Sequence, residues 1–260
     1  MMPIPPAFII SPTDWEAVIF DLDGIVTDTA RLHAAAWKQL FDDYLRQRSS
    51  HDGEIHRPFD KDADYHPYVD GKLRYEGVRS FLASRGITLP YGTPEDGPER
   101  ETVCGLGNKK NALFLQRLQT QGVDVYPSSV HLLERLRAAG IKTALVTASK
   151  NCDTILHVTG LSHLFNVKVD GVVAARLGLE SKPDPATFLQ AARELGSDPA
   201  HGIVVEDAIA GVQAGHNGRF GCVIGVARTV PPEELKNRGA DVVVHDLAEV
   251  VVGGSDIGSE

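Results

Sequence analysis

The chain has 260 residues, enough to bury one large hydrophobic core and a smaller second unit. Its 42% hydrophobic and 23% charged content is ordinary for a globular protein, and no apolar run approaches the roughly 20 residues of a membrane helix. The net charge of −9 argues against broad nucleic-acid binding, which depends on clustered Lys and Arg, but a local pocket can still bind a small anion.

The N-terminus and the cysteines indicate the compartment. The first fifteen residues are rich in proline and lack both a basic region and a long apolar stretch, so we expect an extended arm rather than a signal peptide. Cys104, Cys152 and Cys222 are far apart and share no metal-ligand spacing. We therefore expect reduced, partly buried thiols in a cytoplasmic protein.

Short apolar runs, each bounded by Gly or polar residues, recur along the chain and are typical of strands buried on both faces of a parallel sheet; they occupy 17–20, 143–146, 203–205, 222–226 and 242–244. Helical spacing of apolar residues separates them at 128–139 and 184–195, and a glycine follows each of these two segments. This alternation predicts an α/β fold, an open parallel sheet with helices on both faces.

The stretch from about 30 to 125 breaks this alternation. It carries helical patterns at 30–48, 74–85 and 108–121 and no convincing buried strand, which predicts a helical domain inserted after the first strand. The core domain would then comprise 1–29 and 126–260, and the inserted domain 30–125. The polar segment 49–68 holds several His and Asp residues, but their spacing is irregular, so we predict a solvated loop rather than a second metal site. Residues 90–101 are rich in Pro, Gly and acid.

Two carboxylates follow the first predicted strand. Asp21 comes directly after the run AVIF, and Asp23 lies two residues further on, so extended backbone would point both the same way. Such a repelling pair persists where a cation binds or a proton is shared. Asp21 could attack phosphorus and form an aspartyl-phosphate, with Asp23 as general acid and base. A simple polar turn, which Gly24 permits, is the alternative interpretation.

A second acidic pair, Glu206 and Asp207, follows another predicted strand. Because the ends of parallel strands meet at one sheet edge, both acidic pairs could reach one ion, and oxygen ligands suit Mg²⁺. The alternative for Asp207 is an N-cap of the helical pattern that follows it. Both roles are compatible, because a cap residue can also face a metal.

Two further strand or helix ends carry groups suited to phosphate. Thr147 ends the run TALV and is followed by Ala148, Ser149, Lys150 and Asn151, whose hydroxyl and backbone N–H groups could bind phosphate oxygens. Lys182 precedes Pro183-Asp184-Pro185 and could neutralise charge on a transferring phosphoryl group. Taken singly, each also fits a helix cap or a solvated surface lysine.

These motifs, in this order from about residue 16 to 245, resemble the haloacid-dehalogenase-like hydrolase superfamily. The resemblance implies a Rossmann-like core with a small helical cap domain inserted at 30–125. It implies that Asp21 is the nucleophile, that Asp23 is the acid/base, and that Thr147 and Lys182 bind phosphate. The metal Mg²⁺ would be held by the acids of both pairs, Asp21, Asp23, Glu206 and Asp207.

Longer stretches resemble the β-phosphoglucomutases of that superfamily, namely FDLDGIVTDTARLHAAAWK (20–38), VYPSSVHLLERLR (125–137), TASKN (147–151), SKPDPATF (181–188) and VEDAIAGVQA (205–214). The resemblance implies that His33 assists active-site opening and proton handling, unless it is an ordinary surface or interface histidine. It also implies substrate-binding residues, which are Ala148, Ser149, Lys150 and Asn151 in the core and Arg74, Lys110 and Asn111 in the cap. Each cap residue could instead lie on a solvated helix face, and the segments 49–68 and 90–101 depart from the pattern.

The activity implied is interconversion of β-D-glucose 1-phosphate and glucose 6-phosphate through an aspartyl-phosphate and β-glucose 1,6-bisphosphate, with the cap excluding water during transfer. A small sugar phosphate would be the only partner of a monomer that binds neither nucleic acid nor membrane. The first alternative is a magnesium-dependent sugar-phosphate phosphatase of the same superfamily. The second is a non-catalytic sugar-phosphate sensor, which the presence of both Asp21 and Asp23 disfavours.

Overall fold

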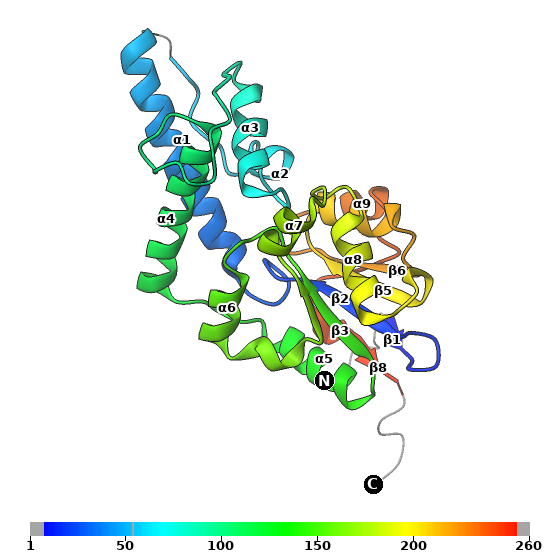
Figure 1. The fold of residues 1–260 in the computed structure, drawn as a ribbon. Helices are drawn as coiled ribbons and strands as arrows, with labels where there is room; N and C mark the ends of the chain where they lie inside the picture. The colour runs from blue at the N-terminus through cyan, green and yellow to red at the C-terminus, as the bar shows by residue number, and fades with distance from the viewer. Residues whose placement is uncertain (1–7, 54, 254–260) are drawn as a thin grey trace. The chain divides into compact units, whose positions relative to one another are not determined.

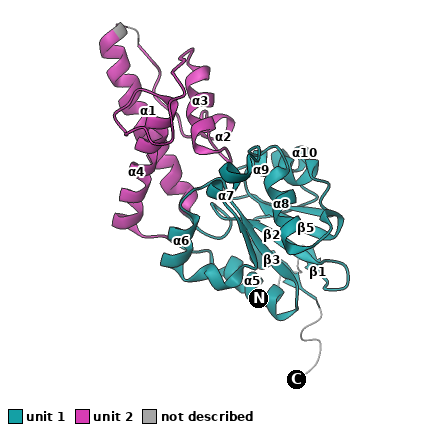
Figure 2. Ribbon diagram, in the orientation of Figure 1, with its two compact units in different colours: residues 1–28, 124–260 teal, residues 29–123 magenta. Residues whose placement is uncertain are grey.

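The computed structural model describes residues 8–53 and 55–253. Its contacts divide the chain into two compact units, which Figure 2 shows in separate colours. Unit 1 comprises residues 1–28 and 124–260, and unit 2 comprises residues 29–123. These divisions lie one and two residues from the boundaries expected from the sequence.

The centre of unit 1 is a six-stranded parallel sheet with the order β4-β3-β2-β5-β6-β7 (Figure 1). Its strands are β2 (Ala17–Asp21), β3 (Lys142–Val146), β4 (Val167–Val169), β5 (Gly202–Glu206), β6 (Cys222–Val226) and β7 (Val242–Val244). All five strands predicted from apolar runs are present. The sequence reasoning missed β4, because its three residues are interrupted by Lys168, and it also missed a small parallel pair of β1 (Phe8–Ile10) and β8 (Val250–Val252).

Helices cover this sheet and bury its apolar residues. One face packs against α8 (Ala186–Leu195), α9 (Ile209–Asn217) and α10 (Pro232–Asn237), where the core includes Ile19, Val204 and Phe188. Helix α5 (Pro127–Ala138) contacts β3 and β8 through its own apolar side chains. The remaining elements of unit 1 are α6 (Cys152–Thr159), α7 (Gly171–Leu177) and the short 3-10 helices at Leu161–Leu164, Pro199–His201 and Leu247–Glu249.

Unit 2 is helical, as predicted, and is formed by α1 (Thr29–Asp52), α2 (Tyr65–Tyr68), α3 (Arg74–Ser84) and α4 (Val103–Gln121). Its core is aromatic, with the Phe41 ring 4.0 Å from that of Phe81 and 5.4 Å from that of Phe59. Helix α4 begins five residues before the expected start, because the hydroxyl of Thr102 caps it by accepting from the Gly105 amide. Glycine is required at Gly105, since a Cβ there would lie 2.2 Å from the Arg100 carbonyl oxygen.

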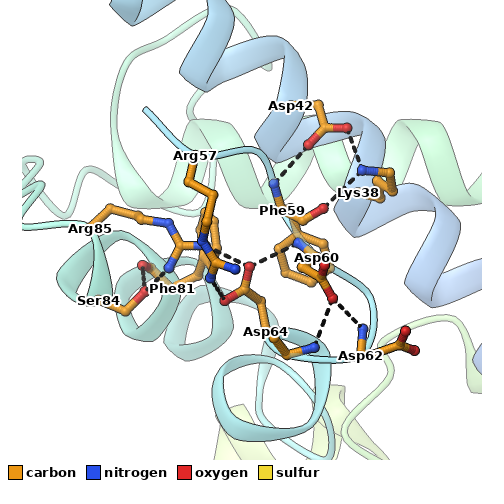
Figure 3. Close-up of polar contacts among 11 residues, drawn as sticks. Lys38, Asp42, Arg57, Phe59, Asp60, Asp62, Asp64, Phe81, Ser84 and Arg85 are labelled. Atoms are coloured by element: carbon orange, nitrogen blue, oxygen red, sulfur yellow. Dashed lines mark hydrogen bonds and ion pairs between the residues drawn. The ribbon is translucent and has the colours of Figure 1, made fainter. Parts of the chain in front are cut away.

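The prediction that 49–68 is a solvated loop is confirmed for its middle, where residues 55–63 are non-helical and mostly exposed, and is wrong at its two helical ends and at two buried residues, Phe59 and Asp64. Helix α1 extends into it, and the Phe59 ring is buried in the aromatic core. Figure 3 shows the buried Asp64 carboxylate accepting from Arg57 at 2.7 Å, from Arg85 at 2.5 Å and from the Asp60 amide at 2.8 Å. The segment is therefore anchored by one aromatic ring and one ion-paired acid, and each has a partner that is distant in sequence: Phe81 for Phe59 and Arg85 for Asp64.

Candidate functional site

The nucleophile candidate, Asp21, is the last residue of β2, at the carboxyl edge of the sheet. The Lys182 ammonium donates to Asp21 Oδ1 at 2.6 Å and to Glu206 Oε1 at 2.5 Å, and this lysine is only 3% exposed. The alternative of a solvated surface lysine is therefore wrong. The Lys182 ammonium also lies over the Phe188 ring, 4.8 Å from its centroid, so it contacts an aromatic ring as well as the two carboxylates.

Burial and neighbouring charges set the electrostatics of this cluster. Burial raises the pKa of the Asp21 carboxyl well above its usual 3.8, Lys182 opposes this, and the negative charges of Glu206 and Asp23 add to it. Burial alone would lower the pKa of Lys182, but the charges of Asp21 and Glu206 outweigh it and raise that pKa above its usual 10.5. Lys182 is therefore a permanent cation placed where negative charge gathers.

The acid/base candidate, Asp23, is fixed by two separate contacts. Its backbone amide donates to Asp21 Oδ2 at 2.7 Å, and its Oδ2 accepts from the Thr147 hydroxyl at 3.0 Å. Thr147 follows β3 directly and is buried. Because β2 and β3 are adjacent parallel strands, their ends hold the Asp21–Asp23 loop and Thr147 together.

The loop after Thr147 folds back on itself through short hydrogen bonds. The Ser149 amide donates to the Thr147 hydroxyl at 3.0 Å, and the Asn151 amide donates to the Ser149 hydroxyl at 3.2 Å. Ala148 and Lys150 complete this loop, and Gly171 packs against Ala148 so closely that a Cβ would lie 2.4 Å from the Ala148 carbonyl oxygen. The five residues predicted to bind phosphate thus form one compact turn before α6.

Glu206 and Asp207 lie at the end of β5, beside β2 in the sheet. Glu206 Oε2 accepts from the amides of Asp207 and Ala208, both at 3.0 Å. Asp207 is not the N-cap of α9, since that position belongs to Ala208. Its carboxylate packs against Gly24, where a Cβ would lie 2.0 Å from Asp207 Oδ2, so Gly24 is what lets the two acidic pairs approach.

These acids have the oxygen chemistry that Mg²⁺ prefers, and Lys182 contacts only two of the four carboxylates, so the donor set leaves negative charge for a divalent ion to offset. The carboxylates are nevertheless not pre-arranged as ligands. Within residues 8–53 and 55–253, no three His, Cys, Asp or Glu side chains are placed to hold a metal. Lys182 instead bridges two of the expected ligands, and the magnesium site stays a prediction.

The four candidate residues of the cap lie in unit 2, where they form two contacting pairs. Arg74, the first residue of α3, donates to Asn111 Oδ1 at 2.8 Å. Lys110 and His33 contact at 2.5 Å between Nζ and Nδ1, and because an ammonium has only donors, Nδ1 is the acceptor. Burial lowers the pKa of Arg74 from its usual 12.5, although the group stays a cation at neutral pH.

Lys110 is 5% exposed and is enclosed by aromatic rings, which excludes a solvated helix face for this residue. Its ammonium lies 4.8 Å from the Trp37 ring centroid and 5.3 Å from that of Phe114, and the Phe114 ring stacks on His33 at 4.1 Å. Sequence reasoning did not assign Phe114 to the site. The available signal was its position four residues after Lys110 on one helix, which places both side chains on the same face.

The parallel-sheet core and the carboxylate–lysine cluster at its carboxyl edge fit the class of enzyme that the sequence comparisons identify. The profile of the haloacid dehalogenase-like hydrolases matches residues 15–219, so the chain belongs to that family and is an enzyme of its class. No helix of the described residues is long and apolar enough to span a membrane.

Three of the similar proteins are named β-phosphoglucomutase. The chain is 47% identical over 243 residues to the β-phosphoglucomutase of Mycobacterium tuberculosis strain CDC 1551, covering 92% of this chain and 93% of that protein. It is 31% identical over 238 residues to the Bacillus subtilis β-phosphoglucomutase, covering 91% and 92%. A crystal structure of the Clostridium difficile β-phosphoglucomutase superposes with a TM-score of 0.70 at 27% identity, covering 90% and 92%.

Proposed function

We propose that this enzyme interconverts β-D-glucose 1-phosphate and glucose 6-phosphate. The observation that carries the proposal is the pair of carboxylates at the end of β2, in which Asp21 is held by Lys182 and Asp23 by Thr147. This arrangement supports Asp21 as nucleophile and Asp23 as acid/base, the two groups that phosphoryl transfer through an aspartyl-phosphate requires. The names of the Mycobacterium and Bacillus relatives support the choice of sugar.

In the proposed cycle, the 6-hydroxyl oxygen of β-glucose 1-phosphate attacks the phosphorus held on Asp21. The bond between phosphorus and the Asp21 oxygen breaks, and Asp23 accepts the hydroxyl proton. The bisphosphate then reorients, and Asp21 attacks its 1-phosphate while Asp23 returns the proton to the leaving oxygen, releasing glucose 6-phosphate. Lys182 offsets the charge that gathers on the transferring group in both steps.

Asp21, Asp23, Glu206 and Asp207 are the residues that would hold Mg²⁺. When bound, the ion would neutralise charge on the phosphoryl oxygens and favour the ionised form of Asp21, whose pKa burial raises. We expect chelation to stop turnover and added Mg²⁺ to restore it. Turnover that survives exhaustive chelation would contradict this assignment.

A mutase must bind a second phosphate besides the one being transferred. We assign this to Lys150 and Asn151 in unit 1 and to Arg74 in unit 2, with Lys110, Asn111 and His33 contacting the sugar. Arg74 is supported by its contact with Asn111, which orients the guanidinium, the group best suited to bidentate phosphate binding. An enzyme without this second phosphate-binding site would transfer the phosphoryl group to water and act as a phosphatase.

The test supplies β-glucose 1-phosphate with and without a trace of β-glucose 1,6-bisphosphate, and measures glucose 6-phosphate and inorganic phosphate. The mutase proposal predicts glucose 6-phosphate as the main product, formed faster with the bisphosphate. Inorganic phosphate as the only product under both conditions would favour the phosphatase, and no turnover of any sugar phosphate would favour the sensor. The Arg74→Ala variant sharpens the result, because it should lower glucose 6-phosphate formation more than phosphate release.

A further inference from the structure

An arginine outside every motif described above contacts the loop that carries Asp23. Arg228 lies two residues after the end of β6, and its Nε donates to the Gly24 carbonyl oxygen at 2.7 Å. Its guanidinium carbon lies over the Tyr126 ring, 3.6 Å from the centroid, and its Nη1 is 3.8 Å from Asp246 Oδ2. The side chain is 16% exposed, so this hydrogen bond is largely shielded from water.

Two of the residues that Arg228 contacts, Gly24 and Tyr126, belong to the segments where the chain leaves and re-enters unit 1. Gly24 lies in the outgoing segment, and Tyr126 in the returning one. These segments are hydrogen-bonded to each other, from the Tyr126 amide to the Val26 carbonyl at 3.0 Å and from the Asp28 amide to the Asp124 carbonyl at 2.9 Å. One guanidinium therefore holds the outgoing segment by a hydrogen bond and the returning segment by stacking.

Gly24 transmits this contact to the candidate acid/base. It follows Asp23 directly, has a φ of +91°, and its amide donates to the Thr27 carbonyl at 2.8 Å. On its other side Gly24 packs against the Asp207 carboxylate. A rotation of the Gly24 peptide would therefore displace Asp23 relative to Thr147 and disturb the packing of Asp207 at the same time.

The chemistry of the contact suits arginine alone. A guanidinium can donate in its own plane while its face stacks on an aromatic ring, whereas an ammonium is a point charge without a face. The Arg228 Nη2 is buried and, among the described residues, no hydrogen-bond acceptor reaches it. A buried donor without an acceptor is unfavourable. The contacts that favour arginine at this position are therefore the Nε hydrogen bond to Gly24 and the contact of the guanidinium with the Tyr126 ring.

We propose that Arg228 is a positioning residue for phosphoryl transfer, which holds the Gly24 carbonyl and thereby the Asp21–Asp23 loop in its reactive geometry. The proposal rests on the function proposed above, and Arg228 itself does not touch the reacting atoms. Because it acts on geometry rather than on substrate binding, its loss should lower kcat about 10- to 100-fold and leave KM within about twofold.

The experiment compares the wild type with Arg228→Lys, Arg228→Met and Tyr126→Leu, the last of which removes the stacking platform and keeps the arginine. The matched control is Arg238→Lys, at an exposed position of α10's C-terminus. For each protein, thermal melting is recorded, and single-turnover phosphorylation of Asp21 by β-glucose 1,6-bisphosphate is followed by peptide mass spectrometry. Steady-state kcat and KM are then measured for the product that the wild type forms.

We expect both Arg228 variants to slow phosphorylation and kcat at an unchanged KM, Tyr126→Leu to do so more weakly, and the control to match the wild type. Wild-type rates in Arg228→Lys and Arg228→Met would overturn the positioning role and leave the proposed function standing. A lower melting temperature with a parallel change in KM would overturn it too, since that describes general loss of structure. If the wild type released only inorganic phosphate, the mutase proposal would fail, while the comparison at Asp21 would still decide the role of Arg228.

Discussion

The two units each contain a buried cluster of opposite charges, and the two clusters are mirror images in sign. In unit 1 the Lys182 ammonium lies between the carboxylates of Asp21 and Glu206. In unit 2 the Asp64 carboxylate lies between the guanidinium groups of Arg57 and Arg85 (Figure 3). Both central residues are almost inaccessible to water, so burial alone does not separate a functional cluster from a structural one.

The difference lies in the sign of the excess charge and in the place of each cluster in its unit. Asp64 links the end of α3 to the segment before α2. Its carboxylate oxygens accept hydrogen bonds from two arginines and a backbone amide. Lys182 is a single cation at the end of a parallel sheet, where further carboxylates follow β2 and β5. An excess of one charge at the carboxyl edge of such a sheet is what a phosphate and a divalent ion can complete. The Asp64 cluster has the opposite excess, of positive charge, and lies away from such an edge, with the Arg57 side chain 57% exposed to water.

The largest effect we expect is from Lys182→Met. Two carboxylates would be left close together and buried, so the unfolding free energy should fall by about 3–5 kcal/mol. Turnover should fall by about 10²–10³-fold, because the cation that stabilises the transferring group is gone. The measurements are urea unfolding and steady-state kinetics, and the matched control is Lys236→Met, an exposed lysine on α10 that is paired with Glu233. Equal results for the two variants would remove the distinction between the clusters.

An intermediate effect is expected from Asp64→Asn, which removes the central charge of the other cluster. The unfolding free energy should fall by roughly 1.5–3 kcal/mol, since charge-assisted hydrogen bonds to Arg57 and Arg85 are lost. Phosphorylation of Asp21 should continue at nearly the wild-type rate. Asp62→Asn is the control, because Asp62 is an exposed neighbour that takes part through its backbone amide. A loss of Asp21 phosphorylation in a folded Asp64→Asn protein would show that this cluster is not purely structural.

The smallest effect that we expect concerns the buried cysteine thiols, which lie outside both clusters. Burial, aided by the charge of Asp241, raises the pKa of the Cys222 thiol from its usual 9.0 to about 12, and burial raises that of Cys152 as well. A raised pKa means that folding favours the protonated thiol, so this contribution to stability is complete below pH 9 and is lost as the pH rises through 12. All three cysteines are buried, and none of them forms a disulfide.

We therefore expect a thiol-specific disulfide reagent at pH 8 to leave Cys104, Cys152 and Cys222 unmodified in the folded protein and to modify all three in denaturant. The reaction is followed by absorbance, with peptide mapping to locate any modified residue. Rapid reaction of one cysteine in the folded enzyme would show an accessible thiolate and contradict the burial seen here.

The core could be predicted from the sequence because its signals are local. The apolar runs that precede Asp21, Thr147 and Glu206 each predict a strand. They also predict where the polar residue lies, because the carboxyl end of a buried parallel strand is at the sheet edge. Lys182 was expected from its place before a turn and a helix. The bridge that it forms between Asp21 and Glu206 could not be, because the partners are 161 and 24 residues away.

The cap was harder to predict because its decisive contacts carry no local pattern. Asp64 stands in a polar stretch whose composition suggests solvation, and Arg85, one of its two ion-pair partners, is 21 residues further along the chain. The available signal was the aromatic residues of this polar stretch, Phe59, Tyr65 and Tyr68, which all pack in the aromatic core. The start of α4 was missed for a related reason, since Gly105 and Gly107 lower helix propensity but are needed beside the Arg100 backbone and the Tyr75 ring.

The central claim, that Asp21 carries the phosphoryl group, is tested most directly by trapping it. The enzyme is mixed with β-glucose 1,6-bisphosphate and Mg²⁺, quenched rapidly in acid, and mapped by peptide mass spectrometry beside Asp21→Asn and Asp23→Asn. We predict one phosphoryl group on the peptide containing Asp21, none in Asp21→Asn, and turnover lower by about 10²–10⁴-fold in Asp23→Asn. Turnover in Asp21→Asn, or a phosphoryl group on another residue of the active wild type, would contradict the account.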